Sequence, residues 1–566
     1  MFALQKLYVF ISFAPEFISG IILYSIMKKF LYFLLCLGLI VGCEGLDKYP
    51  GADEFNPGQT KPEQKPDNQD PENPDQPENP NPDQPENPDP EQPENPDPEQ
   101  PTDPDQPTDP DQPVDPTPGW NYAPVTVGMI GHYGLSYVWD ESVIPEITIS
   151  ISKDEWNKFL AAYDQRPSNK DYFYCDITYK KGSETTTVTD AGIRLRGNTS
   201  RRRPEAHRND GKHVTNGADW QHCHFGINLR KFVKDGSHEI QGIRKFNLKW
   251  FKDDPCYVRE LFCYDLFRRA GIWTAAFDVY CRLWIHVEGD SKPAYYGVYE
   301  MIEPYDNKYL EKREQWFGSA DGNLWKCSYD SHGPADLRDH NANMAEDNNR
   351  DDFTYELKEY GESFSTAKAQ LQDFIKKING KAHGTPGDSF YTWIKQVCDV
   401  ELLMRTYAVN VAVGMWDDMW NNGNNYYLYF NSSDLYDYKV FLIPYDYDNS
   451  LGTSNGYDAA KQDPYNWGDR GILMERMMEY EEFRNIYRDE LKRLVDPAYG
   501  LMDTESARQR ILDWQAKIQN YITNDTGEDM EIKDRPAGWG RVGDYRLMST
   551  SNNYFTVKAE TINKMR

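Results

Sequence analysis

Hydrophobic and polar residues alternate along several short segments in the first half of the folded region. A period of two predicts β-strands, because successive side chains of a strand point to opposite faces. The segment 144–151 follows this pattern, and Ser152-Lys-Asp-Glu155 directly after it is typical of the capping box that begins a helix. The other strands predicted in this half are 172–179, 186–196, 225–229, 246–250, 279–287 and 294–302, the last two as an antiparallel pair around Glu288-Gly289-Asp290.

Apolar residues recur at helical spacing in the second half. Residues 257–270 have this spacing and stop at Gly271, a residue type that commonly ends a helix. Strands come first and helices later, without a repeated strand–helix–strand unit. The pattern therefore predicts an α+β fold with a strand-rich N-terminal part and a helix-rich C-terminal part. Further helices are predicted at 371–378, 400–413, 471–495 and 504–522, with late strands at 426–430 and 439–444.

A long acidic segment precedes these elements. Residues 44–119 consist largely of Pro, Asp, Glu, Gln and Asn, and Pro-Glu-Asn-Pro-Asp-Gln-Pro units recur in it. Frequent proline excludes helices and sheet ladders, and repulsion between like charges extends the chain. We interpret the segment as a disordered stalk that acts as a spacer. Binding of Ca²⁺ by its carboxylates is the alternative, which we discount because no turn brings them together.

Residues 27–43 have the pattern of a lipoprotein signal peptide. Two lysines precede an apolar run of signal-peptide length, which ends in Ile-Val-Gly-Cys. This ending resembles a bacterial lipobox, in which the cysteine is acylated and becomes the new N-terminus. We therefore expect a lipid on Cys43, translation that starts at Met27, and residues 1–26 to be a mis-annotated extension. A transmembrane anchor built from both apolar stretches is the alternative, but charged residues interrupt it.

Charge narrows the class of partner. The net charge is −29, and more than half of it lies in 57–118, where 18 acidic residues stand against two lysines. The region 120–566 is therefore only moderately acidic. It carries no overall basic field that would hold a phosphate backbone, which disfavours a nucleic-acid partner.

The cysteines give no disulfide framework. Seven lie beyond Cys43, an odd number without repeated spacing. We expect buried free thiols, with one or two bridges as the alternative.

Three polar motifs lie next to the ends of predicted strands. A Walker loop, a Gly-x-Ser-x-Gly elbow and a His-Glu-x-x-His motif are all absent from the sequence. The motifs that are present are Arg194-Leu-Arg-Gly-Asn-Thr-Ser200, Asp417-Asp418 with Asn424-Asn-Tyr-Tyr-Leu-Tyr429, and Pro444-Tyr-Asp-Tyr-Asp448.

The last of these motifs suggests a metal site. Asp446 and Asp448 share a face if the strand continues through them, and two carboxylates on one face repel each other unless a cation lies between them. Hard oxygen ligands favour Mg²⁺, Mn²⁺ or Ca²⁺. A solvated turn, in which the two side chains only cap local backbone, is the alternative. We favour the metal because the apolar lead-in 440–444 indicates a buried strand, where unpaired carboxylates are costly.

In this order, the three motifs resemble those of the CotH family of spore-coat kinase-like proteins. The resemblance covers about 144–488, and we take 120–566 as one CotH-like domain with a C-terminal helical extension. Three more segments resemble the family: Phe246-Asn-Leu-Lys249 followed by Asp253-Asp254 and Arg259-Glu260, Tyr296-Gly-Val-Tyr299 leading to Glu303, and Gly322-Asn-Leu-Trp-Lys326.

The resemblance implies an atypical protein-kinase-like fold that binds ATP and a divalent metal, Mg²⁺ or Mn²⁺, and phosphorylates Ser or Thr of protein partners. By motif, Asp417 is the aspartate that orients the acceptor hydroxyl. Asp446 is the principal metal ligand and Asp448 a second, while Asn425 holds a metal or fixes the loop. These roles suit phosphoryl transfer, in which cations neutralise the phosphates. The resemblance also implies two groups of nucleotide-binding residues. Arg196, Asn198 and Ser200 lie over the phosphates. Glu303 forms an ion pair with Lys249 or Lys326, and this pair binds the phosphates.

The sequence departs from the family pattern after the first of the three motifs, which ends at Ser200. The family usually runs through lysines into the next strand, whereas Arg201-Arg-Arg-Pro204 opens an insertion that reaches Phe225. Lys212 or the three arginines are therefore alternative residues for binding the phosphates. In another alternative no basic residue binds them. The arginine run also fits a solvated loop. Tyr445 stands where the family usually has Trp.

The insertion also contains a His-Cys-His sequence. By alternation His222 and His224 share a strand face, where a metal could bridge them with Cys256 as a third ligand. A polar strand at the edge of the insertion is the alternative, and we favour it because no paired ligand spacing occurs elsewhere.

The sequence leaves three functions open. The first is a lipoprotein kinase of the cell envelope, in the outer membrane or on the cell surface. The second is a non-catalytic surface module that binds protein or glycan ligands on a kinase-like scaffold. The third is a metal-dependent hydrolase, which we rank last because the chain lacks the histidines that two-metal sites commonly use.

Overall fold

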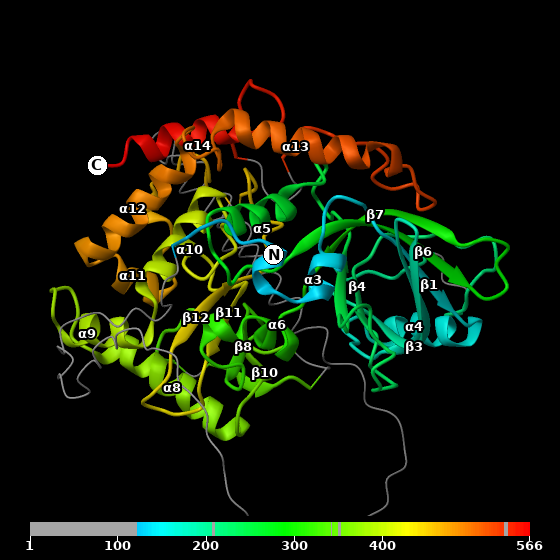
Figure 1. Ribbon diagram of the computed structural model, residues 1–566, viewed down its shortest axis with the longest axis horizontal. Coiled ribbons are helices and arrows are strands. Elements are labelled where there is room, and N and C mark those ends of the chain that lie inside the picture. Colours follow the sequence, from blue (N-terminus) through cyan, green and yellow to red (C-terminus); the bar gives the residue numbers. More distant parts are fainter. Residues whose placement is uncertain (1–120, 207–209, 341, 349–351, 455, 537–541) are drawn as a thin grey trace, which may run out of the picture. The chain divides into compact units, whose positions relative to one another are not determined.

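A computed structural model describes residues 121–566 except 207–209, 341, 349–351, 455 and 537–541 (Figure 1). The predictions for the N-terminal extension, the signal peptide with Cys43, and the whole stalk lie outside these residues. Within them, no helix is both long and apolar enough to cross a membrane. All seven cysteines beyond Cys43 are buried and free, which confirms that prediction.

Seven strands close into a barrel in the order β1-β2-β3-β4-β5-β7-β6 (Figure 1). Neighbouring strands are antiparallel, apart from β1 and β6, which run parallel and close the barrel. Every strand predicted in the first half of the folded region is present. Their bounds are β1 (Glu146–Ile151), β2 (Phe173–Lys181), β3 (Glu184–Leu195), β4 (Phe225–Asn228), β5 (Lys245–Lys249), β6 (Asp278–Val287) and β7 (Ala294–Ile302).

Alternation along the strands separates the barrel core from the outer face. On β3, Ile193 and Leu195 are buried in the core, while Arg194 points the other way and is only partly buried. In antiparallel strands, residues opposite each other share a face. Arg194 lies opposite Gly226 of β4, so polar positions of neighbouring strands gather on the outer face of β3, β4 and β5.

Two helices cover parts of the barrel. Helix α4 (Lys153–Gln165) begins as predicted, with the Ser152 hydroxyl accepting the Glu155 N–H at 3.2 Å. Helix α5 (Arg259–Arg269) corresponds to the prediction for 257–270. The Asp254 carboxylate accepts the N–H groups of Val258 and Arg259, both at 2.8 Å, and thereby satisfies donors at the start of α5.

A second sheet has the strand order β12-β11-β8-β10-β9. Its strands β11 and β12 are buried along their whole length, as their continuous apolar and tyrosine sequence suggests. Strands 426–430 and 439–444 were predicted, whereas β8, β9 and β10 were not. The bounds are β8 (Asn323–Cys327), β9 (Met344–Glu346), β10 (Tyr355–Glu359), β11 (Tyr426–Phe430) and β12 (Val440–Pro444).

Helices dominate the C-terminal half. The single helix predicted for 471–495 is two helices, because Tyr480 between them is extended and donates its hydroxyl to the Asp388 carboxylate at 2.9 Å. The α+β prediction is consistent with this mixed structure; the closed barrel was not foreseen. The remaining helices of four or more residues are α3 (Tyr133–Val138), α6 (Asn307–Lys312), α7 (Glu314–Phe317), α8 (Phe364–Gly380), α9 (Ser389–Val397), α10 (Val400–Ala412), α11 (Ile472–Met477), α12 (Glu481–Val495), α13 (Thr504–Ile518) and α14 (Tyr554–Asn563), besides the short 3₁₀ turn η1 (Val127–Ile130).

Candidate functional site

A cavity of about 860 Å³ lies against the polar outer face of β3, β4 and β5. Its other walls come from β8, β10 and the loops that follow α10 and β12. This size is in the range of sites that hold a nucleotide-sized ligand. All ten residues to which the family resemblance assigned a role line it: Arg196, Asn198, Ser200, Lys249, Glu303, Lys326, Asp417, Asn425, Asp446 and Asp448. Of the alternative phosphate-gripping residues, Arg201 lines the cavity, whereas Lys212, Arg202 and Arg203 do not.

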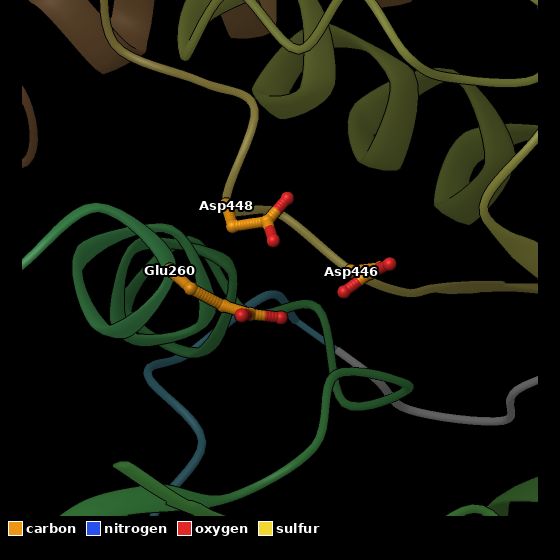
Figure 2. Close-up of side chains that lie close together, drawn as sticks. All are labelled: Glu260, Asp446 and Asp448. Atoms are coloured by element: carbon orange, nitrogen blue, oxygen red, sulfur yellow. The ribbon is translucent and has the colours of Figure 1, made fainter. Parts of the chain in front are cut away.

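Three carboxylates converge on one wall of this cavity. Glu260 of α5 points toward Asp446 and Asp448, which lie on the loop after β12 (Figure 2). One oxygen from each of the three lies within 4.8 Å of the others. Carboxylate oxygens at this spacing are the donors that Mg²⁺ and Mn²⁺ prefer, so the residues present fit a divalent cation.

The structure corrects how the two aspartates come together. The prediction placed them on one face of a continuing strand, but β12 ends at Pro444. Asp446 has a left-handed φ of 64°, and the chain turns at Tyr447 and Asp448. A turn, rather than strand alternation, therefore brings the carboxylates together. Glu260 was not nominated as a ligand, although its position in the first turn of α5 was readable from the sequence.

Lys249, the last residue of β5, lies among these carboxylates. Its ammonium contacts Glu260, lies 2.5 Å from Asp446 Oδ1 and lies 3.5 Å from Asp448 Oδ2. Only 8% of Lys249 is exposed. Burial would lower its pKa, but the carboxylates outweigh burial and raise the pKa well above the usual value, so the amine is charged.

The pKa values of Asp446 and Asp448 shift in opposite directions beside Lys249. Burial would raise the pKa of Asp446, but Lys249 outweighs that effect and lowers it. Burial raises the pKa of Asp448 well above its usual range, and the neighbouring carboxylates of Asp446 and Glu260 add to the effect. Because one ammonium faces three carboxylates, the cluster has unbalanced negative charge that a divalent cation would compensate.

The predicted ion pair has a different acidic partner. Glu303 lines the cavity, but its carboxylate accepts hydrogen bonds from Arg313 at 2.7 and 3.1 Å, so it is not the partner of Lys249 or Lys326. The ion pair that the structure forms is Lys249 with Glu260. Lys326 lies 5.6 Å from the centre of the Tyr445 ring and has no carboxylate oxygen within 4.0 Å among the described residues.

Asp417 lies on the loop after α10 in the same cavity. Its carboxylate accepts hydrogen bonds from the side-chain amides of Asn422 at 2.5 Å, Asn424 at 3.0 Å and Asn425 at 3.0 Å. Burial raises the pKa of Asp417, and these donors oppose that rise because they favour the ionised form. Asn425 therefore orients Asp417, and its carbonyl oxygen is the atom it could offer to a metal.

Asp418 plays a different part from its neighbour. Its carboxylate is buried and accepts from Asn410, Tyr407, Trp467 and the backbone N–H of Asn421. It is absent from the lining of the cavity. Asp418 therefore holds the loop in place, while Asp417 faces the cavity.

The Gly197 turn after β3 supplies the remaining nominated residues. Gly197 has a φ of 99°, and a Cβ there would lie 2.3 Å from Ser200 Oγ, so the turn requires glycine. Arg196 donates to the Tyr445 hydroxyl at 3.3 Å, which links this turn to the loop carrying Asp446. Asn198 is exposed and Ser200 is half-buried at the mouth of the cavity.

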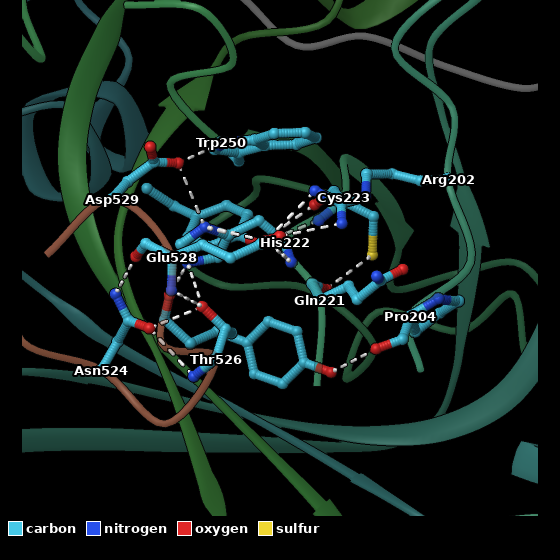
Figure 3. A network of polar contacts seen from close by, with 12 residues as sticks. Arg202, Pro204, Gln221, His222, Cys223, Trp250, Asn524, Thr526, Glu528 and Asp529 are labelled. Carbon is cyan, nitrogen blue, oxygen red and sulfur yellow. Dashed lines mark hydrogen bonds and ion pairs between the residues drawn. The ribbon is translucent and has the colours of Figure 1, made fainter. Parts of the chain in front are cut away.

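His222 and His224 make separate contacts. His222 Nε2 contacts the Tyr296 carbonyl at 2.8 Å and belongs to a polar network with Glu528 and Asp529 (Figure 3). The Cys256 thiol donates to backbone carbonyls of the same C-terminal segment. His224 Nδ1 accepts the backbone N–H of Trp250 at 3.0 Å. Strand β4 begins only at Phe225, so the polar strand that we favoured does not include His222 or His224, and strand alternation does not place them on one face.

Comparison with known proteins gives two findings. A family model described as "CotH kinase protein" matches residues 193–557, which is more than half of the chain. The curated relative "Inner spore coat protein H" of Bacillus subtilis (strain 168) is 23% identical over 317 residues, which cover 54% of this chain and 79% of that protein. The match of the family model begins near the end of β3 and ends within the first half of α14.

Proposed function

The chain belongs to the CotH kinase protein family, and on that premise we propose that it is a metal-dependent kinase that transfers a phosphoryl group from ATP to Ser or Thr of protein partners. The observation that carries the proposal is the contact of Lys249 with Glu260, Asp446 and Asp448 on one wall of a cavity of nucleotide size. Phosphoryl transfer needs such an arrangement, in which cations are placed beside acidic metal ligands.

The residues present suggest how a nucleotide is held. Asp446, Asp448 and Glu260 would hold Mg²⁺ or Mn²⁺, with the carbonyl oxygen of Asn425 as a further donor. The bound metal would supply positive charge that neutralises the phosphates. Lys249 stays tethered to Glu260, so its ammonium can also contact a phosphate oxygen without leaving the wall. Arg196 and Lys326 add positive charge to the same cavity.

Asp417 is the acceptor-side group of the proposal. Three asparagine amides fix its carboxylate, and it faces the cavity that Asp446 and Asp448 also line. A fixed carboxylate can accept the hydrogen bond of an incoming Ser or Thr hydroxyl and orient its oxygen toward the phosphate. This arrangement also gives the hydroxyl proton an acceptor during transfer.

We also propose where the kinase acts. A lipid on Cys43 and the stalk 44–119 would hold the domain at the cell envelope, in the outer membrane or at the surface. Protein partners within reach of the stalk would then be the acceptors.

The test is phosphoryl transfer by the purified chain. It is incubated with labelled ATP and Mn²⁺ or Mg²⁺, with casein as the acceptor. We expect label on casein or on the chain itself, and loss of that label in Asp446→Asn. Asp437→Asn, which changes an exposed aspartate outside the cavity, is the matched control. Absence of transfer by the unmodified chain with either metal would contradict the proposal.

The competing function is a non-catalytic surface module on the same scaffold. The observation in its favour is that Lys249 already occupies the space between the carboxylates. Thermal unfolding with ligands separates the two functions. ATP with Mn²⁺ should raise the Tm of the kinase and should not do so in Asp446→Asn. The Tm of a non-catalytic module should not change with the nucleotide and should rise with a protein or glycan ligand.

A further inference from the structure

Helix α10 carries a buried asparagine, Asn410, near its C-terminal end. Only 3% of Asn410 is exposed, and the other residues of 408–412 are buried and apolar. Asparagine is a poor helix former, and burying its amide is costly unless the amide is hydrogen-bonded. The oxygen and the nitrogen of this side chain must therefore both have partners.

The partners of Asn410 lie on two different loops. We call residues 445–451, which follow β12, the acidic loop, and residues 415–424, which follow α10, the acceptor loop. From the acidic loop, the Tyr447 hydroxyl donates to Asn410 Oδ1 at 2.8 Å. On the acceptor loop, Asp418 Oδ2 accepts a hydrogen bond from Asn410 Nδ2. One side chain thereby joins the two loops through buried hydrogen bonds.

The joined residues are neighbours of the carboxylates that the proposed function uses on these loops. Tyr447 lies between Asp446 and Asp448, and Asp418 directly follows Asp417. A shift of Tyr447 would move both carboxylates on the metal side. A shift of Asp418 would move the carboxylate on the acceptor side. The side chain that connects Tyr447 to Asp418 is therefore placed to set the spacing between the two sides of the site.

Other parts of α10 support this connection. Tyr407 lies one turn before Asn410 on the same face of the helix, and its hydroxyl donates to Asp418 Oδ2 at 3.1 Å. The backbone carbonyl of Asn410 accepts the N–H of Met415 at 3.1 Å, where the acceptor loop begins. The helix therefore holds the acceptor loop by its backbone and by two side chains.

Two further hydrogen bonds keep the same parts of the chain together. The Leu451 N–H donates to the Val413 carbonyl at 2.7 Å, and Trp416 Nε1 donates to Thr453 Oγ1 at 3.1 Å. Neither contact involves the Asn410 side chain. They remain when that side chain is changed, so a substitution there removes one connection without separating the loops.

We propose that Asn410 is a positioning residue that couples the acidic loop to the acceptor loop, so that a change in one loop is transmitted to the other. A buried chain of hydrogen bonds has few alternative arrangements, because any group that leaves it would strand a partner away from water. The coupling itself needs neither nucleotide nor metal. Its consequence for transfer rests on the proposed function: it would keep Asp417 aligned with the carboxylates on the metal side.

The test measures hydrogen–deuterium exchange in the purified full chain without nucleotide or metal. Tyr447→Phe removes only the hydroxyl that donates to Asn410. We expect exchange in the acceptor loop to become about 10-fold faster, although the substitution lies in the acidic loop. The Asn421 N–H, which donates to Asp418 at 2.7 Å, is one of the amides that should exchange faster. Burial raises the pKa of Asp418 to about 7, so exchange is followed above this pH, where the carboxylate is ionised.

Tyr264→Phe is the matched control. It also removes a buried tyrosine hydroxyl bonded to the acidic loop, because the Tyr264 hydroxyl accepts the Asp446 N–H at 3.1 Å, but this contact does not involve Asn410. We expect faster exchange in the acidic loop of this variant and none in the acceptor loop. Exchange in α4, which lies outside both loops, is the internal reference, since general loosening of the protein would speed it as well.

Asn410→Leu removes the connection from its middle with a side chain of similar size. We expect about 10-fold faster exchange in the acceptor loop. Adding Tyr447→Phe to it should add little, because both substitutions act on one connection. Thermal unfolding shows whether each variant is folded, and Tyr447→Phe keeps the comparison valid if Asn410→Leu is not.

Two results would overturn the coupling. One is unchanged exchange in the acceptor loop of both Tyr447→Phe and Asn410→Leu. The other is an equal rise of exchange in that loop in Tyr264→Phe and Tyr447→Phe.

Steady-state kinetics separates the coupling from the kinase proposal. If the chain transfers phosphate from ATP, Asn410→Leu should lower kcat about 10-fold, while the Kd for ATP with Mn²⁺ changes by about twofold at most. If the chain never transfers phosphate but the acceptor loop responds to Tyr447→Phe, the kinase proposal fails and the coupling stands. If transfer and exchange are both unchanged in Asn410→Leu, the coupling fails and the kinase proposal stands.

Discussion

Glu260 accepts the backbone N–H of Tyr447 at 3.1 Å, and its other carboxylate oxygen contacts Lys249. This one side chain therefore joins three elements: helix α5, strand β5 and the loop after β12. The Tyr264 hydroxyl on α5 adds a second tie, because it accepts the Asp446 N–H at 3.1 Å. Any movement of α5 would carry the acidic loop with it, so the wall that bears the carboxylates behaves as one unit.

Asp446→Asn should lower transfer from ATP by at least ~100-fold, because it removes a metal ligand and several kcal/mol of charge stabilisation with it. Calorimetry with ATP and Mn²⁺ should show the loss as weaker binding of the metal–nucleotide pair. Unchanged transfer would show that Asp446 is not a metal ligand.

Asp417→Asn should separate transfer from binding. The asparagine keeps the size of the side chain but loses the charge that orients the acceptor hydroxyl, so kcat should fall roughly 100-fold or more while the Kd for ATP changes little. Steady-state kinetics with calorimetry measures both quantities.

Asp418→Asn is the matched comparison for Asp417→Asn. The buried Asp418 carboxylate accepts hydrogen bonds from four donors. In the asparagine variant an NH₂ group replaces one of its oxygens, so donors that faced that oxygen lose their acceptor. We expect a loss of about 1–3 kcal/mol in the free energy of unfolding, measured with denaturant. If Asp417→Asn destabilised the protein as much as Asp418→Asn, the division of roles between the two aspartates would be wrong.

Lys249→Met should make the protein depend on metal for stability. The substitution leaves three clustered carboxylates without their cation, which costs roughly 3 kcal/mol for a buried group. Mn²⁺ should then raise the Tm of this variant more than that of the unmodified chain, because the metal replaces the lost charge. Lys252→Met is the control, since Lys252 pairs with Asp253 outside the cluster. An equal Mn²⁺ effect in both variants would argue against a metal site.

Stability should rise with pH above neutrality because of Lys558. This residue of α14 is fully buried, and burial lowers its pKa to about 7; its amine donates to the Ala459 carbonyl at 2.9 Å. Between pH 7 and the ordinary lysine pKa of 10.5, which applies to the unfolded chain, the Lys558 amine is protonated in the unfolded chain and neutral in the folded chain. Raising the pH in this range therefore favours folding.

Lys558→Met removes this linkage. From pH 7 to pH 9, the free energy of unfolding of the unmodified chain should rise by about 1–3 kcal/mol relative to that of the variant. Denaturant unfolding across this range measures the difference. Parallel curves for the two proteins would show that the amine stays charged in the folded state.

The N-terminal proposal has its own test. Mass spectrometry of the mature chain should find an acylated Cys43 at the N-terminus, and Cys43→Ser should move the protein out of the membrane fraction. An intact Met1 on the mature chain would exclude the lipoprotein interpretation.

Local patterns predicted local structure well. The period-two segments became β1 to β7, and Ser152 caps α4 as its sequence indicated, because these features depend on neighbours along the chain. The long helix predicted for 471–495 failed where Tyr480 reaches α9 and bonds Asp388, a tertiary contact that periodicity does not encode.

In the candidate site, too, contacts between distant segments could not be predicted from the sequence. The resemblance nominated residues that all line one cavity, but it gave Lys249 the wrong acidic partner. Glu303 is held by Arg313, which follows it by ten residues and is buried. Glu260 takes its place because the first turn of α5 brings its carboxylate against the Lys249 ammonium.

The parallel pairing of β1 with β6 has a consequence for how the chain folds. Glu146 and Arg282, which pair across these strands, are 136 positions apart, so the barrel stays open until β6 has been made. Contacts over such separations form slowly, because a long loop must close first. Until then β1 exposes an unpaired edge that can join other chains. Nascent chains should therefore depend on a chaperone through this interval, and shortening the delay between β1 and β6 should raise the yield of folded protein.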